Sequence, residues 1–334
     1  MKRARVVLFS LIVFTAALLL AGFLFLSMQS PGPWKKPAPS SDIYRKSATP
    51  GLPHEHVPGA VGTIAGASVR INDLGFRGPP LSVDKPEETI RIAVLGDSIV
   101  FGQGVDEKHT LSKLLEEKLE KQAPGIDWQV INAGVRAYNS ANYRVLFKEK
   151  ILPLKPDLIV LVITEINDPE RKPFRPSSQK LERWKDSAWK KVPLVRRFIA
   201  ASYAEEINRL FEAHVEALYD NDGKQFQSFR EDIRAIAEVC EANSVALIAV
   251  TFPMLADENI FKEERERLQE MLANEGIFYV DPRPAFVKIP AEKLVVGPRD
   301  FHPNRKALRI VADLLKRPVL QKTGVKGKPK KADK

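Results

Sequence analysis

Ser98 is the residue of this chain whose setting points most directly to chemistry. It stands in the segment RIAVLGDSIVFG, residues 91–102, where the apolar run 92–95 predicts a buried strand that Gly96 ends. A serine on a tight turn at the carboxyl end of a central strand holds its hydroxyl at the edge where open α/β sheets bind ligands. Because Gly96-Asp97-Ser98 also makes ordinary strand-to-helix turns, its meaning depends on the polar residues downstream.

Further polar residues follow later predicted strands or precede the last predicted helix. Acyl transfer needs a nucleophile, a base, a carboxylate that orients the base, and donors for the oxyanion. We assign Ser98 as the nucleophile, His302 as the base and Asp300 as the orienting acid. The N–H groups of Ser98 and Gly134, with the side-chain amide of Asn167, complete the predicted oxyanion hole.

The acid of this set has a competitor. Asp300 lies two residues before His302, and such residues in an extended strand share a face without necessarily forming a hydrogen bond. In a tight loop before a helix, however, the two side chains can converge, and Asp supports such turns. Asp281 ends another predicted strand at the same sheet edge and could reach the base from the side. We favour Asp300 and keep Asp281 as the alternative.

These segments, taken in order over about residues 91–315, resemble the blocks of the SGNH (GDSL) hydrolase superfamily. GDSIVFG fits the GDSxxxG pattern of the first block, and INAGVRAYNS supplies Gly134 for the second. The third block, GxND in the family, is Glu165-Ile166-Asn167-Asp168, which lacks the glycine. The last block, DxxH, is Asp300-Phe301-His302, one residue shorter. The upstream segment INDLGFRG is similar to what precedes the first block in membrane-anchored bacterial members.

The resemblance implies a flavodoxin-like α/β three-layer sandwich around a parallel five-stranded sheet of order 2-1-3-4-5. It also implies metal-free ester hydrolysis without a cofactor. Our leading interpretation is a serine carboxylic ester hydrolase, with the O-acetyl groups of an envelope polysaccharide as a candidate substrate. The alternatives are a lysophospholipase or thioesterase, an acyltransferase that uses the same residues, and a degenerate scaffold that binds a glycan without cleaving it.

The order of the predicted elements agrees with this architecture. Strands are predicted at 68–71, 92–95, 128–135, 158–164, 245–252 and 277–280, and helices from 110 onward and at 143–151, 226–243 and 305–316. Alternation of strands and helices predicts a parallel, doubly wound sheet. Residues 169–222 depart from this alternation, ending in an amphipathic helix through Ile207, Leu210, Phe211 and Val215. This insertion could be a lid over the site or simply pack on its flank.

Other reactive side chains have ordinary structural explanations. Cys240, the only cysteine, stands in an apolar helical stretch and is expected to be a buried thiol. His54-Glu55-His56 could supply two metal ligands, but with no further ligands at suitable spacing a solvated loop is the better interpretation. We expect Asp97 to brace the serine turn. His109 and His214 are expected to be surface or satisfied histidines.

The N-terminal segment predicts a membrane anchor. Lys2, Arg3 and Arg5 precede an uninterrupted apolar run at 6–28, close to the roughly 20 residues that cross a bilayer. A cleaved signal peptide has a shorter apolar core, roughly 7–15 residues, and a small-residue cleavage site. We therefore predict a cytoplasmic stub and signal anchor at 1–28 in the inner membrane, with the remainder facing the periplasm.

The composition limits the possible domain organisation and the possible partners. The 334 residues are 44% apolar and 28% charged, which is enough for a packed core, and the formal charge is +10. We predict a linker at 29–56, a hydrolase domain at 57–316 and a basic, disordered tail at 317–334. The basic excess favours an anionic surface or polymer, and no nucleic-acid-binding motif accompanies it. The oligomeric state stays open.

Overall fold

The computed structural model describes residues 43–171, 174–178, 193–220, 223–255, 260–298 and 300–326. The chain divides into two compact units, Met1–Pro39 and Ser40–Lys334, and every described residue belongs to the second. No helix in the described ranges has the length and apolar character needed to cross a bilayer. The predicted anchor at 1–28 lies outside those ranges.

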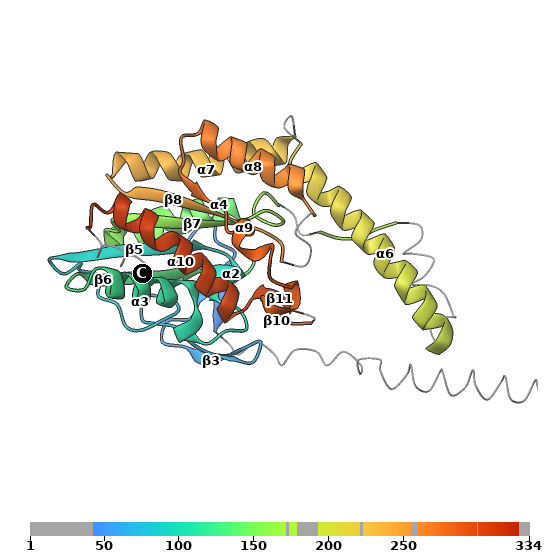
Figure 1. Cartoon of the computed structure of the whole chain (residues 1–334), viewed down its shortest axis with the longest axis horizontal. Helices are drawn as coiled ribbons and strands as arrows, with labels where there is room; N and C mark the ends of the chain where they lie inside the picture. Colours follow the sequence, from blue (N-terminus) through green and yellow to red (C-terminus); the bar gives the residue numbers. More distant parts are fainter. Residues whose placement is uncertain are drawn as a thin grey trace, which may run out of the picture. The chain divides into compact units, whose positions relative to one another are not determined.

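A parallel five-stranded sheet forms the centre of the second unit (Figure 1). Its strands are β5 (Thr89–Gly96), β6 (Asp127–Gly134), β7 (Leu158–Thr164), β8 (Ala246–Phe252) and β9 (Tyr279–Val280), in the spatial order β6-β5-β7-β8-β9. Numbered along the chain, this is the order 2-1-3-4-5. The predicted α/β fold and its sheet order are therefore confirmed.

Two apolar layers cover the sheet because its central strands carry apolar residues on both faces. In β7, Leu158, Val160 and Val162 pack on one side, and the intervening Ile159, Leu161 and Ile163 pack on the other. Helices α3 (Leu111–Gln122) and α10 (Arg305–Lys322) cover the first side. Helices α4 (Ser140–Leu146), α7 (Lys224–Ala242) and α8 (Lys262–Asn274) cover the second (Figure 1).

Several elements were not predicted from the sequence. They include helix α8 and the short helices α2 (Ser98–Phe101) and α9 (Arg283–Phe286). The π-helical turn η2 (Phe147–Ile151) continues α4, and 3-10 turns occupy Glu107–His109, Leu152–Leu154 and Ala291–Lys293. Three antiparallel hairpins join β1 (Tyr44–Lys46) with β2 (His54–His56), β3 (Val61–Ile64) with β4 (Ala67–Arg70), and β10 (Val295–Gly297) with β11 (Asp300–Pro303).

The linker prediction for 29–56 is wrong at its carboxyl end, because the folded unit already includes the β1–β2 hairpin. Glu55 and His56 are buried, so the predicted solvated loop at His54-Glu55-His56 is also wrong. Burial is possible because Lys150 and Arg45 neutralise Glu55. The ring of His56 is bonded to the carbonyl of Gly75 at 3.0 Å. Burial lowers the pKa of His56 to about 4.

The predicted start of the tail at 317 is wrong as well. Helix α10 continues to Lys322 through Pro318, and Val319 and Leu320 are buried. A proline inside a helix removes one hydrogen bond. The packing of these two apolar side chains against the same layer as Leu315 offsets that cost.

Part of the insertion at 169–222 is described. Its amphipathic helix is α6 (Pro193–Leu218), in which Val215 and Leu218 are buried and Phe211 packs against the same apolar layer. Phe174 stacks edge-on against Phe211, with ring centroids 5.4 Å apart. Residues 172–173, 179–192 and 221–222 lie outside the described ranges, so a lid function stays a prediction.

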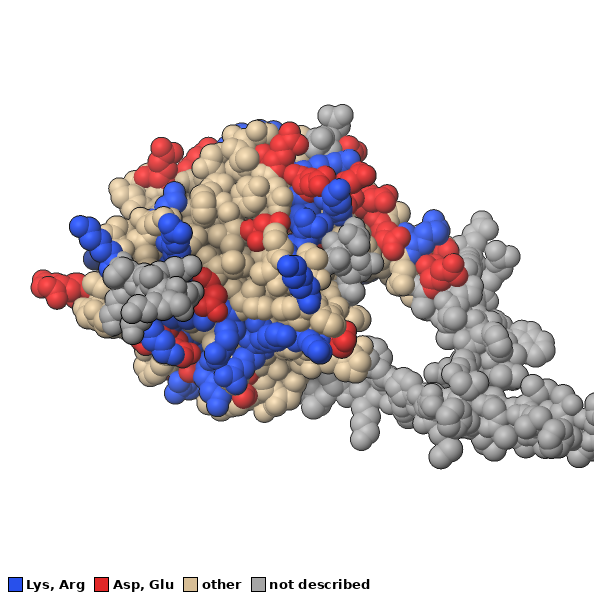
Figure 2. Space-filling model, viewed as in Figure 1, with Lys and Arg blue, Asp and Glu red and all other residues tan. Residues whose placement is uncertain are grey.

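Basic side chains gather on the face that carries α3 and α10 (Figure 2). Lys108, Arg305 and Arg309 all act electrostatically on His109, and with burial they lower the pKa of that imidazole. The charges of Arg309 and Lys118 also lower the pKa of the Glu117 carboxyl group. We call Lys108, Lys118, Arg305 and Arg309 the basic face.

Candidate active site

The carboxyl edge of the sheet holds a cavity of about 510 Å³. Eight residues line it, drawn from the serine turn, the segments after β6 and β7, the last hairpin and the N-terminal hairpin: Tyr44, His54, Ser98, Gln103, Arg136, Ala137, Asn167 and His302. All but Ala137 carry a polar atom in the side chain. This edge is where ligands bind in open α/β sheets.

The turn that carries Ser98 is held at its start by Asp97 and Gly96. The carboxylate of Asp97 accepts a hydrogen bond from the N–H of Ile99 at 2.8 Å and so caps α2 at its N-terminus, which agrees with the predicted bracing role. A Cβ on Gly96 would lie 2.5 Å from the side chain of Val100 and 3.1 Å from the carbonyl of Val162. Only glycine lets the turn close against β7.

The far end of α2 is held by Arg77, a buried residue of the segment INDLGFRG. Its guanidinium donates to the carbonyls of Phe101, Gly102 and Val105 at 2.7–2.8 Å and to that of Ser68 at 2.9 Å. One cation thus bridges the carbonyls at the end of α2 and in the segment that follows it. Burial lowers the pKa of Arg77 to about 10.

Ser98, His302 and Asp300 form a continuous hydrogen-bonded chain. The Oγ of Ser98 lies 2.9 Å from Nε2 of His302, and Nδ1 of His302 lies 2.5 Å from Oδ1 of Asp300. The same carboxylate oxygen accepts the main-chain N–H of His302 at 3.1 Å. Asp300 and His302 both lie in strand β11 rather than in a loop, so they share a face, and this second bond draws the two side chains together.

Gln103 completes this side of the cavity, and the sequence analysis missed it. Its Nε2 donates to Oδ2 of Asp300 at 3.4 Å and lies 3.2 Å from Nδ1 of His302. With Nδ1 protonated toward Asp300, the amide can donate only to the carboxylate. Partial burial acts to raise the pKa of Asp300, but the hydrogen bonds from His302 and Gln103 outweigh it and lower the pKa.

The alternative acid, Asp281, lies elsewhere. It accepts hydrogen bonds from the side chain of Gln269 at 3.1 Å and from the N–H of Arg283 at 2.8 Å. The structure therefore brings Asp300, and not Asp281, to His302.

Asn167 faces the cavity from the end of β7. Its Nδ2 donates to Oδ2 of Asp97 at 2.9 Å, and Thr164 donates to the same oxygen at 3.3 Å. An amide nitrogen carries two hydrogens, so one fixes Asn167 to the serine turn and the second is available to the cavity that Asn167 lines.

The predicted place of Gly134 in the oxyanion hole is wrong. Its N–H donates to the side chain of Asn132 at 3.1 Å, and Gly134 is not among the lining residues. A Cβ there would lie 2.0 Å from the main-chain nitrogen of Phe101, so the glycine is needed for close packing of α2 on β6. Two residues of this segment line the cavity, Arg136 and Ala137, and Ala137 is exposed with φ +60°. A non-glycine residue with positive φ is uncommon and points to a functional constraint.

The β1–β2 hairpin supplies another wall of the cavity, through Tyr44 and His54. The rings of Tyr44 and His54 pack against each other with centroids 5.5 Å apart. The centroid of the His54 ring also lies 5.2 Å from that of the Tyr138 ring. Nε2 of His54 is bonded to the main-chain carbonyl of Arg136 at 2.9 Å, and the hydroxyl of Tyr138 donates to the carbonyl of His54. The hairpin is thus tied to the segment after β6.

The remaining reactive side chains are accounted for. Burial raises the pKa of the Cys240 thiol to about 12, in agreement with a structural thiol. His214 pairs with Glu170 at 2.8 Å, and His109 is half-buried in a 3-10 turn. Within the described residues, no three His, Cys, Asp or Glu side chains converge where they could hold a metal.

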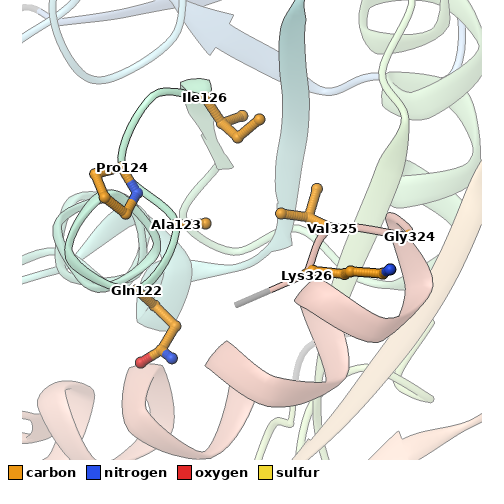
Figure 3. A pocket seen from close by; sticks show the side chains of 7 residues that line it. All are labelled: Gln122, Ala123, Pro124, Ile126, Gly324, Val325 and Lys326. Atoms are coloured by element: carbon orange, nitrogen blue, oxygen red, sulfur yellow. The ribbon is translucent and has the colours of Figure 1, made fainter. Parts of the chain in front are cut away.

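A second cavity lies where the end of α3 meets the chain after α10 (Figure 3). Ala123, Ile126 and Val325 give it an apolar floor, and Lys326 contributes its charged group. Its lining holds neither a nucleophile nor an acid, so it offers no chemistry comparable to that at Ser98.

Residues 94–310 match the model of the GDSL-like Lipase/Acylhydrolase family. The chain belongs to this family. Similar solved structures include a lipase/acylhydrolase from Enterococcus faecalis, at 17% identity and a TM-score of 0.45, covering 73% of this chain and 100% of that one. Another is an acetylxylan esterase from Geobacillus stearothermophilus, at 14% identity and a TM-score of 0.44, covering 72% and 98%. A comparison with curated proteins finds no match.

Proposed function

We propose that this GDSL-family acylhydrolase is a serine esterase that cleaves carboxylic esters at Ser98. The observation that carries the proposal is the chain of contacts from Ser98 through His302 to Asp300, at 2.9 and 2.5 Å. It joins a nucleophile, a base and an orienting carboxylate, the parts that acyl transfer from an ester requires.

In the proposed mechanism, Nε2 of His302 takes the proton of Ser98 as Oγ attacks the ester carbonyl carbon. Asp300, held ionised by its hydrogen bonds, stabilises the imidazolium that forms. His302 then gives its proton to the departing alcohol, which leaves an acyl group on Ser98. A water molecule, deprotonated by His302, releases the acid and restores the serine.

The oxyanion of each tetrahedral intermediate needs donors beside Ser98. We assign this role to the N–H of Ser98, the N–H of Ala137 and the free amide hydrogen of Asn167. Ser98 is the first residue of α2, where an N–H has no helical acceptor. Ala137 takes the place that the sequence analysis gave to Gly134, because it lines the cavity and its left-handed conformation turns the backbone there.

The lining of the cavity favours a short acyl group on a polar alcohol, such as an O-acetyl group of an envelope polysaccharide. A lysophospholipase or a long-chain thioesterase needs a groove of apolar side chains. The described lining contributes only Ala137 and parts of two aromatic rings toward one. An acyltransferase would use the same residues with a sugar hydroxyl in place of water. The intact hydrogen-bonded chain weighs against a scaffold that only binds.

A fluorophosphonate probe tests the proposal, because only an activated serine reacts with it. The full-length protein in mild detergent should be labelled and should hydrolyse nitrophenyl acetate. Ser98→Ala should abolish both activities, with a loss on the order of 10⁶-fold in turnover. Ser68→Ala, at an exposed strand serine, is the matched control and should behave as the parent. Labelling or turnover that persists in Ser98→Ala would contradict the serine mechanism.

We further propose that residues 1–28 anchor the protein in the inner membrane and that the hydrolase unit faces the periplasm. The basic residues before the long apolar run support this orientation. A periplasm-active reporter fused after Lys334 should be active, and the protein should fractionate with membranes. A shortened soluble form that begins near residue 30 would show cleavage instead.

A further inference from the structure

Arg136 places a positive charge in the wall of the cavity that holds Ser98. It is half-buried and lines that cavity, and among the described residues no carboxylate forms an ion pair with it. Arg171, which is also half-buried, is by contrast paired with Asp232. A partly desolvated guanidinium without a counter-charge is costly, and a ligand that brings an anion offsets the cost.

Tyr44 and His54 hold Arg136 in place. His54 is bonded to the main-chain carbonyl of Arg136, which fixes the backbone at this point. Burial raises the pKa of the Tyr44 hydroxyl to about 12, and the nearby guanidinium of Arg136 opposes that rise; both residues line the cavity. No carboxylate is part of this arrangement. The wall therefore offers guanidinium N–H donors in a restrained position.

The position of Arg136 relates the charge to the reacting ester. Arg136 directly precedes Ala137, whose N–H we assign to the oxyanion hole, and both residues line the cavity with Ser98. An anion at the guanidinium would therefore lie in the same cavity as the carbonyl under attack. Arginine binds carboxylates in a planar, two-pronged geometry, which selects an acid at a defined place on the substrate.

We propose that Arg136 binds a carboxylate on the alcohol part of the ester, so that the substrate class is an O-acylated acidic saccharide. This inference rests on the proposed function and specifies its substrate. The polar lining suits a sugar better than a lipid chain, and the basic face on α3 and α10 would attract an acidic polymer (Figure 2). In the reaction the acyl group passes to Ser98 and then to water. The saccharide leaves as the free alcohol, with its carboxylate unchanged.

Two matched substrates test the inference with the full-length protein. The methyl glycosides of O-acetyl glucuronic acid and O-acetyl glucose, acetylated at the same hydroxyl, differ only in the carboxylate. We expect kcat/KM to be roughly 10- to 100-fold higher for the acidic substrate, the usual range for a charge-assisted hydrogen-bonded pair. In Arg136→Gln this ratio should fall close to one, and Arg136→Lys should keep part of it.

Arg309→Gln is the matched control, because it removes the same charge from the basic face outside the cavity. It should keep the parent's ratio of kcat/KM values, which would separate local binding from general attraction. A parent ratio near one, or a lysophospholipid cleaved in preference to the acidic sugar, would overturn the inference while the esterase proposal stands. If the parent fails to hydrolyse even nitrophenyl acetate, the proposed function itself is wrong.

Discussion

The two walls of the Ser98 cavity are built in different ways. On one wall the side chains of His302, Asp300 and Gln103 are joined by hydrogen bonds, and His302 is in turn bonded to Ser98. On the other wall His54 is bonded to the main-chain carbonyl of Arg136, and Tyr44 lies near its guanidinium, for which the described residues supply no acid. The hydrogen bonds of the first wall are complete without a substrate, whereas under our proposal the second wall is complemented by an anion. Under the proposed function, the wall with the last hairpin would carry the reaction, and the wall with Arg136 would select the substrate.

The largest effect should come from the acid on the first wall. Asp300→Asn would place an amide against Nδ1 of His302 and favour the tautomer that cannot accept the proton of Ser98. Turnover should fall by up to ~10⁴-fold, as measured by ester hydrolysis under saturating substrate. Asp281→Asn should cost mainly stability, because it removes the bonds to Gln269 and Arg283. An inactive Asp281 variant beside a normal Asp300 variant would show that our acid is misassigned.

A smaller effect is expected at Asn167, which also lines the cavity. Asn167→Ala removes one side-chain donor from the oxyanion hole and should lower kcat by roughly 10²–10³-fold with little change in KM. Thr164→Val is the control, because it removes the other donor to Oδ2 of Asp97 and leaves the cavity unchanged. Equal losses in both variants would mean that Asn167 acts only by bracing Asp97.

The smallest effect concerns how the second wall is attached. Hydrogen bonds from Lys150 and Arg45 outweigh the opposing effect of burial and lower the pKa of Glu55 below its usual 4.5. Its stabilising contribution is therefore present above pH 4.5 and is lost as the pH falls through the lowered pKa. Glu55→Gln should reduce the free energy of unfolding by about 1 kcal/mol at pH 7, because its partners are partly exposed.

Urea unfolding at pH 7 and at pH 3 measures this contribution, and the difference between parent and variant should shrink at the lower pH. Glu117→Gln, which breaks an exposed pair with Lys121 on α3, is the control and should change little. A difference for Glu55 that is independent of pH would assign its role to packing rather than charge.

The sequence predicts the first wall better than the second for a physical reason. The sheet is encoded in long apolar runs such as β7, and the reactive residues follow strands whose ends must meet at one edge. The β1–β2 hairpin has only three residues in each strand and lies among prolines and serines, a composition typical of linkers. Its burial depends on partners distant in the chain, such as Lys150, which no local pattern indicates.

The oxyanion-hole residue shows a second limit of prediction from sequence, because the sequence indicated Gly134 and the structure favours Ala137. Glycine is the expected residue where a backbone turns with positive φ, so the glycine of INAGVRAYNS was the natural choice. Here the left-handed residue is an alanine, and the glycine is required for the contact between α2 and β6. Gln103 gave no sequence signal, because its role depends on a hairpin that forms far along the chain.

The hydrogen bonds from Arg77 to the end of α2 have a consequence for where the hydrolase unit begins. The segment that matches the family starts at residue 94, yet the far end of the serine turn is tied to an arginine before it. A shortened protein cut at the family boundary would lose the guanidinium that bridges the carbonyls of Phe101, Gly102 and Val105. The segment that carries Arg77 thus belongs to the same structural unit as the nucleophile, and any truncation of the hydrolase must keep it.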